Sequence, residues 1–100
     1  MVTRIWEGRT KIEHSETYTK IIRERDIPDY KKTKGFTGLK FLNRSDDQYT
    51  YFKLLTFWED FDAIVNFTGP NMERPKHYDS DKSYLLDFPG KVSHYTVFAQ

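Results

Sequence analysis

Hydrophobic and polar residues alternate along four stretches of the chain, and this alternation predicts four β-strands. The first stretch is Val2–Arg9 and the last is Val92–Ala99. Between them, Phe36–Asn43 and Gln48–Trp58 flank the polar residues Arg44–Asp47. Alternation with a period of two places successive side chains on opposite faces of a strand, and a short polar turn between two such runs is typical of a hairpin. The two central stretches are therefore predicted to form a β-hairpin.

Two other segments repeat apolar residues at helical spacing. From Ser15, interpreted as an N-cap, apolar residues recur every three or four positions, and Pro28 is expected to interrupt this helix. Asp60 is expected to cap a second, shorter helix that Gly69 and Pro70 terminate. The stretch Asn71–Phe88 shows no clear period and is predicted to be mostly irregular.

The order of these elements is β-α-β-β-α-β over one domain, residues 1–100. This order predicts an α+β, ferredoxin-like fold in which both helices cover one face of a four-stranded antiparallel sheet. Large rings occur on both faces of the predicted strands: Trp6, Tyr49, Tyr51, Phe52, Phe57, Trp58 and Tyr95. A single copy would leave one of these faces in water, so we expect a second copy to cover it in a homodimer.

The composition removes several classes of function. The chain has 16 basic and 15 acidic residues and a net charge of +1, so no strong field attracts nucleic acid or anionic lipid. It has no cysteine, which excludes disulfides, thiolate nucleophiles and iron–sulfur clusters. No apolar run is long enough to cross a membrane, and we expect a cytoplasmic protein. The histidines are not at metal-ligand spacing, so no metal is expected.

Two residues are candidates for acid–base chemistry. His77 lies beside apolar segments in the irregular stretch, where an imidazole can act as a base near neutral pH or bind iron. The alternative is a surface histidine that makes one backbone hydrogen bond. Glu7 shares a strand face with Ile5, and apolar neighbours can raise the pKa of a carboxyl group. The alternative for Glu7 is an ion pair with Arg9 or Lys11.

The whole chain resembles stand-alone antibiotic biosynthesis monooxygenase domains of the dimeric α/β-barrel superfamily. The residues that carry the resemblance are Arg4–Gly8, Ile27–Tyr30, Leu54–Glu59, Asp62–Ile64 and His94–Val97. The resemblance implies that two sheets face each other across a dimer and form a barrel. Such an arrangement would cover the rings on the second face of the sheet.

The resemblance also implies two kinds of chemistry. The anthrone-type oxygenases of the family use a strand-three tryptophan, matched here by Trp58, but their asparagine and helix tyrosine are replaced by Leu54 and Ile64. The haem-degrading branch uses an asparagine, a tryptophan and a histidine, and the matching positions here are Glu7, Phe67 and His77. Only the histidine of that second set is retained.

These observations lead to one main hypothesis, a cofactor-independent monooxygenase that oxidises a small aromatic or quinol-like molecule with O2. The resemblance suggests His77 and Glu7 as catalytic residues, with Trp58, Phe67 and Tyr78 as the walls of the substrate site between helices and sheet. His77 would be the base or the anion partner, and Glu7 a polar contact. Two alternatives remain open: a non-catalytic dimer that binds a small ligand, and a haem-binding or haem-degrading protein that uses His77.

Overall fold

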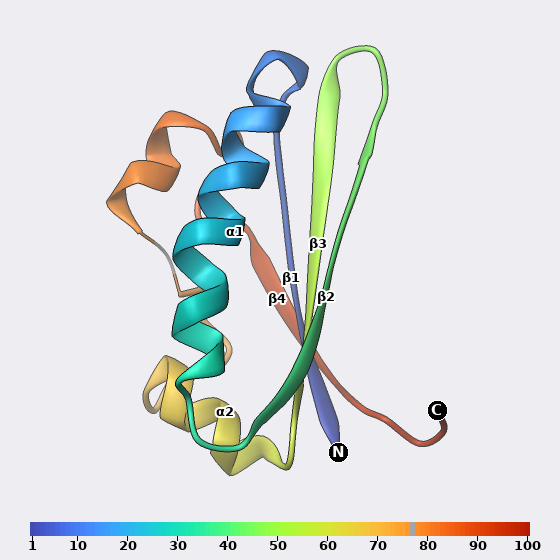
Figure 1. The fold of residues 1–100 in the computed structure, drawn as a ribbon, viewed down its shortest axis with the longest axis vertical. Helices are drawn as coiled ribbons and strands as arrows, with labels where there is room; N and C mark the ends of the chain where they lie inside the picture. The colour runs from blue at the N-terminus through green and yellow to red at the C-terminus, as the bar shows by residue number, and fades with distance from the viewer. Residues whose placement is uncertain (77) are drawn as a thin grey trace.

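The computed structural model describes residues 1–76 and 78–100. The elements in chain order are β1 (Val2–Lys11), η1 (Ile12–His14), α1 (Ser15–Lys31), β2 (Phe36–Ser45), β3 (Tyr49–Trp58), α2 (Phe61–Thr68), η2 (Asp79–Ser83) and β4 (Lys91–Thr96), where η marks a 3₁₀-helix. Figure 1 shows the sheet edge-on, with α1 and α2 together on one side of it.

All four strands form one antiparallel sheet in the order β2-β3-β1-β4. In the middle of the sheet, Trp6 of β1 lies opposite Leu54 of β3 on one side and Val92 of β4 on the other. This topology confirms the predicted α+β, ferredoxin-like fold. The sheet therefore has one face covered by helices and one open face (Figure 1).

The core lies between the helices and the sheet and consists of two clusters. One cluster groups the buried side chains Trp6, Tyr18, Ile22, Phe52, Leu54 and Leu85. The other groups Val2, Tyr30, Trp58, Ala63 and Ile64. Within the second cluster, the rings of Tyr30 and Phe67 stack with their centroids 4.4 Å apart. Aromatic rings thus supply much of the buried area, because each ring removes a large apolar surface from water.

The first helix differs from the prediction at both ends. Its first residue is Ser15, but the hydroxyl of Ser15 makes no capping hydrogen bond, because η1 leads directly into α1. The expected interruption at Pro28 is wrong, since α1 continues to Lys31. Pro28 lies in the last turn, so the missing N–H removes one backbone hydrogen bond close to the end of the helix. Continuing the helix also buries Tyr30, which is only 7% exposed.

A β-bulge in β2 changes which residues of this strand face the core. Strict alternation would place Phe36 and Phe41 on opposite faces of the sheet. The register shifts between Phe36 and Gly38, and as a result both rings contact Tyr30 on the helix side. The bulge therefore turns β2 so that its first residue also contributes to the core.

The second helix, the hairpin and the last strand are confirmed with small changes of boundary. Asp60 caps α2 by accepting a hydrogen bond from the backbone N–H of Ala63 at 2.8 Å, and Gly69 follows the helix with φ of 80°. The hairpin turn begins at Asp46 rather than Arg44, because Oδ1 of Asp46 accepts from the backbone N–H groups of Gln48 and Tyr49. The last strand ends earlier than predicted, at Thr96.

The open face of the sheet carries four of the seven rings identified in the sequence. Tyr49, Tyr51, Phe57 and Tyr95 lie on this face, as the strand register and their partial exposure show. The other three rings are buried beneath the helices. Tyr95 is 55% exposed and Leu42, on the same face, is 49% exposed. The apolar surface of the open face therefore consists of these four rings and their aliphatic neighbours.

Candidate functional site

The structure places two of the predicted site residues together on the helix side of the sheet. The side chain of Trp58 is fully buried, and its Nε1 donates a hydrogen bond to Oγ1 of Thr56 at 2.9 Å. Its ring centroid lies 5.9 Å from that of Phe67 on α2. Phe67 in turn stacks on Tyr30. Trp58 is therefore a core residue that supports Phe67.

Tyr78 lies next to α1. Its hydroxyl donates a hydrogen bond to Oδ2 of Asp29, and the guanidinium carbon of Arg25 lies 3.9 Å from the centre of its ring. This hydrogen bond lowers the pKa of Asp29, whereas burial, together with the bond, raises the pKa of Tyr78. His77, the sequence-based candidate base, lies outside the described residues.

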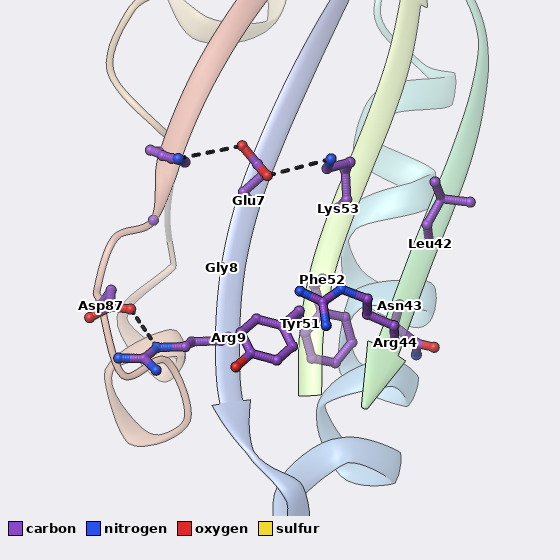
Figure 2. Close-up of a pocket in the computed structure, with 12 residues that line it drawn as sticks. Glu7, Gly8, Arg9, Leu42, Asn43, Arg44, Tyr51, Phe52, Lys53 and Asp87 are labelled. Carbon is purple, nitrogen blue, oxygen red and sulfur yellow. Dashed lines mark hydrogen bonds and ion pairs between the residues drawn. The ribbon is translucent and has the colours of Figure 1, made fainter. Parts of the chain in front are cut away.

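Glu7 lies on the open face, away from the other predicted site residues. Its carboxylate is held between two ammonium groups, with Oε1 3.7 Å from Nζ of Lys53 and Oε2 3.8 Å from Nζ of Lys91 (Figure 2). The partners suggested by the sequence, Arg9 and Lys11, are not those observed. Arg9 instead pairs with Asp87 at 2.7 Å.

Glu7 lines a groove of about 720 Å³ on the open face, which we call the open-face groove. Its aromatic wall includes Tyr51, whose ring centre lies 4.3 Å from the guanidinium carbon of Arg44. Figure 2 shows this pair beside Arg9 on the neighbouring strand. The volume is in the range of small-ligand sites. The groove nevertheless lies on the same face as the exposed rings, and any second copy that packs on this face would close it.

A second cavity lies between α1 and the sheet, and we call it the inner cleft. Four residues of α1 at a spacing of four are buried: Tyr18, Ile22, Asp26 and Tyr30. Because residues four apart share one face of a helix, the carboxyl group of Asp26 belongs to the buried face. The cavity beside it has a volume of about 20 Å³, which is room for one water molecule.

Charged and phenolic groups are concentrated around the inner cleft. Arg25 bridges two carboxylates, with Nε 2.7 Å from Oδ1 of Asp26 and Nη2 2.9 Å from Oδ1 of Asp81. The hydroxyl of Tyr18 donates to the same oxygen of Asp81 at 3.0 Å. Burial raises the pKa of Asp26 although Arg25 opposes the shift. Burial also raises the pKa of Tyr18.

Arg4 enters the inner cleft from β1 and is 3% exposed. Its guanidinium donates to the backbone carbonyls of Met72 and Arg74, and Nη1 lies 3.1 Å from Nε2 of His94. None of the ion pairs formed among residues 1–76 and 78–100 includes Arg4. Burial lowers the pKa of Arg4, because removal from water disfavours its charged form.

Asp26 and Arg4 were not selected from the sequence, although a signal for each was present. Arg4 lies between Val2 and Trp6 on one face of the predicted first strand, so alternation placed it among buried side chains. Asp26 lies midway in the series that includes Ile22 and Tyr30. A charged residue at an apolar position of such a pattern is a useful signal, because burying it without a function or a partner is unfavourable.

Within the described part of the chain, no three His, Asp or Glu side chains are close enough together to hold a metal ion. No helix there is both long and apolar enough to span a bilayer. Asp26 and Asp81 already share Arg25, which further disfavours a cation between them.

Comparisons with known proteins add information about the fold. No protein-family model matches the sequence, and no curated protein matches it. Among solved structures, a proposed antibiotic biosynthesis monooxygenase from Nitrosomonas europaea is similar, with a TM-score of 0.74 and 16% identity over 99% of this chain and 100% of that one. A second, from Bacillus cereus, has a TM-score of 0.70 and 14% identity over 99% of this chain and 94% of that one.

A third similar structure is a mutant of MhuD with two manganese protoporphyrin IX molecules bound per active site. It has a TM-score of 0.67 and 14% identity over the whole of this chain and 97% of that one. The resemblance to antibiotic biosynthesis monooxygenase domains is thus confirmed at the level of the fold, along nearly the full chain.

Proposed function

We propose that this chain is a cofactor-independent monooxygenase of the antibiotic biosynthesis monooxygenase type, which oxidises a small aromatic or quinol-like substrate in the inner cleft. One observation carries the proposal. A carboxyl group with a raised pKa, Asp26, lines a cavity with a buried cation, Arg4, and two phenols. Groups with perturbed pKa values that gather in a cavity are typical of catalytic sites, because chemistry needs them and stability does not.

In this mechanism Asp26 removes a proton from the substrate. A base is most effective when its pKa lies close to the working pH, and burial moves the pKa of Asp26 in that direction. The resulting carbanion or enolate is electron-rich enough to reduce O2. One oxygen atom enters the product as a carbonyl group that replaces two C–H bonds, and the other leaves as water, so four electrons pass from substrate to O2.

In this proposal the structure is a closed form, because the inner cleft as it stands is too small for a ring compound. The cavity holds about one water molecule, and its lining includes Phe67 of α2 and Lys76 of the following segment. Nζ of Lys76 lies 4.2 Å from the centre of the Phe67 ring. A ring compound enters when these two side chains turn aside, and their return excludes water from the reactive anion.

The other predicted residues have supporting positions in this proposal. Phe67 is a wall of the cleft, as the sequence suggested, and Trp58 supports it from behind. Tyr78 orders Asp29 and Arg25 next to Asp26. Glu7 lies on the open face and therefore acts outside the cleft. His77 remains the base suggested by the family resemblance, and its replacement tests that role against Asp26.

We also propose that a second copy of the chain packs on the open face and closes the open-face groove. The support is the set of rings on this face, of which Tyr95 is 55% exposed, together with the exposed side chain of Leu42. The ammonium groups of Lys53 and Lys91 are already neutralised in part by Glu7. This pairing lowers the penalty for covering them.

A non-catalytic dimer that binds a small ligand is the second candidate. It is favoured by Leu54 and Ile64, which occupy the positions of catalytic residues in the anthrone-type branch and are 4% and 0% exposed, respectively. Both are packed in the core and offer no polar atom to a substrate. The inner cleft of this chain therefore lacks that branch's proton-transfer residues.

An oxygen electrode separates the two candidates. The purified protein is incubated with a series of hydroquinones and anthrone-like compounds, and oxygen uptake and thermal stability are recorded for each compound. Oxygen uptake that is lost in Asp26→Asn supports the monooxygenase. Thermal stabilisation without any uptake supports the binder instead. A Soret band on titration with haem that is absent in His77→Ala would contradict both and indicate haem binding.

A further inference from the structure

Arg4 carries a buried positive charge that has no acidic partner among residues 1–76 and 78–100. It is 3% exposed, and its observed acceptors are two backbone carbonyls and the imidazole of His94. A buried charge is normally paired with an opposite charge, because desolvation is costly and neutral acceptors compensate for it only in part. The interior around Arg4 is therefore well suited to an anion.

The charges around the inner cleft support this conclusion. The groups that face Arg4 or line the cleft with it are Tyr18, Asp26 and Tyr30 of α1, Lys76 and Asp81 of the segment after α2, and His94 of β4. The carboxylates of Asp26 and Asp81 both pair with Arg25. Both carboxylates that line the cleft are therefore already paired with Arg25, and neither forms an ion pair with Arg4.

We propose that Arg4 is the anion-binding residue of the inner cleft, and that the cleft takes phenols or enols as their conjugate bases. This inference rests on the proposed function, whose substrate class it narrows. A substrate with an acidic hydroxyl group places its oxygen at the guanidinium, where the negative charge is stabilised in a water-poor environment.

Tyr30 and Arg4 both line the inner cleft. Arg4 is among the charged groups that act on the hydroxyl of Tyr30. Burial and the neighbouring carboxylate of Asp26 raise the pKa of Tyr30, so Tyr30 itself stays neutral. No hydrogen bond joins Tyr30 to Arg4 in the described part of the chain, whereas a ligand phenol that accepts directly from the guanidinium would gain stabilisation of its anion that Tyr30 does not have.

The competing role for Arg4 is purely structural, because its bonds to the carbonyls of Met72 and Arg74 hold the segment after α2 against the sheet. Loss of stability in an Arg4 variant would fit both roles. A useful test must therefore report the ionisation of a bound ligand, which a structural role does not change.

The probe is 4-nitrophenol, whose phenolate absorbs visible light and whose phenol does not. Its absorbance is titrated against pH in the presence of saturating wild-type protein, and the neutral ether 4-nitroanisole is tested for binding in parallel. We expect the apparent pKa of the bound nitrophenol to fall by about one unit or more, a tenfold increase in its ionisation constant. We also expect nitroanisole to bind at least tenfold more weakly.

Two variants and one control identify the cation. Arg4→Gln should abolish the shift, and Arg4→Lys should keep part of it, because an ammonium group preserves the charge. Lys53→Gln removes a cation of the open-face groove and should leave the shift unchanged. If Arg4→Gln does not fold, the comparison of nitrophenol with nitroanisole in the wild type still shows whether the cleft binds the phenol as an anion.

The inference is overturned if bound nitrophenol keeps or raises its pKa, if the ether binds as well as the phenol, if neither binds, or if the shift depends on Lys53. Its failure is distinguishable from failure of the proposed function. Oxygen uptake with a neutral substrate would retain the function and reject anion binding. A nitrophenolate complex without any oxygen uptake would retain anion binding and reject the proposed function.

Discussion

Nη1 of Arg4 lies 3.1 Å from Nε2 of His94, which makes this imidazole the acceptor of a hydrogen bond from a guanidinium. Only the neutral imidazole has a free lone pair, and the neighbouring cation disfavours a second positive charge. Both effects act together with desolvation, which is the largest cause of the lowered pKa of His94. The protonation of His94, a residue of β4, is therefore linked to the stability of the folded protein.

Acidification should therefore destabilise the protein through His94. Below pH 6.5, the ordinary pKa of histidine, the unfolded chain binds a proton that the folded chain resists until a lower pH. Stability is thus present above this range and is lost as the pH falls towards the pKa of the folded state. Urea unfolding between about pH 5 and 7.5 should show this loss in the wild type and a smaller loss in His94→Gln. Equal slopes would contradict it.

Asp26→Asn should separate activity from stability. Turnover is expected to fall by about a hundredfold or more, the usual contribution of a general base. Stability at pH 7 should not fall, and we expect a gain of up to about 1 kcal/mol, because the raised pKa of Asp26 means that its ionised form is unfavourable in the fold. The ionised carboxylate of Asp26 destabilises the fold increasingly as the pH rises from 3.8, the ordinary pKa of this group, through its raised pKa in the folded state. A large loss of stability would identify Asp26 as a structural partner of Arg25.

His77→Ala tests the base that the family resemblance suggests. If Asp26 is the base, this variant should keep oxygen uptake within about threefold of the wild type, far less than the loss expected for removal of a base. Initial rates with one accepted hydroquinone, measured for His77→Ala and Asp26→Asn at equal protein concentration, provide the comparison. A hundredfold loss in His77→Ala alone would return the role to the histidine.

Gly90→Ala should destabilise the fold much more than Gly69→Ala. Both glycines have positive φ, 88° and 80°, which is unfavourable for alanine by about 1 kcal/mol. A Cβ on Gly90 would in addition lie 2.6 Å from the carbonyl oxygen of Glu7 and 2.7 Å from Nε1 of Trp6. A Cβ on Gly69 would meet nothing within 4 Å.

We therefore expect a loss of about 3 kcal/mol for Gly90→Ala and about 1 kcal/mol for Gly69→Ala in urea unfolding. Similar losses for the two variants would show that the turn before β4 rearranges to accept a methyl group.

Leu42→Glu should weaken the proposed dimer. Leu42 lies on the open face and is 49% exposed, so the change should affect the single copy little. Burying an unpaired carboxylate between two sheets is unfavourable, and we expect the dissociation constant to rise about tenfold or more. Val65→Glu is the matched control, because Val65 is an exposed aliphatic residue of α2 on the helix side. Analytical ultracentrifugation over a concentration series gives both constants, and a monomeric wild type would refute the dimer.

The sequence was sufficient to predict the order of the elements, because alternation and helical spacing follow directly from which side chains must be buried. Local signals were less reliable where tertiary packing outweighed them. Pro28 did not end α1, since burial of Tyr30 favours one more turn. The bulge near Phe36 leaves no signature in the local sequence, because it appears only in the pairing of β2 with β3.

The candidate site was harder to predict than the fold. Glu7 was recognised as a carboxylate on a strand, but only the sheet register shows that Lys53 and Lys91 flank it on the open face. Asp26 and Arg4 come from segments more than twenty residues apart, and their shared cavity exists only after α1 packs on the sheet. Family resemblance directed attention, through Phe67, to the side of the sheet on which the inner cleft lies, without identifying these two groups.

The strand order β2-β3-β1-β4 has a consequence for how the molecule assembles. β1 lies in the interior of the sheet and pairs with β3 and with β4, both of which are distant from it along the chain. Within the sheet, only β2 and β3 are both paired and consecutive in sequence. We therefore expect folding to start at the β2–β3 hairpin, because the pairings of β1 with β3 and β4 require the closure of long loops. Until β4 docks, one edge of β1 is unpaired, so folding intermediates without this pairing can add a strand from another chain at that edge.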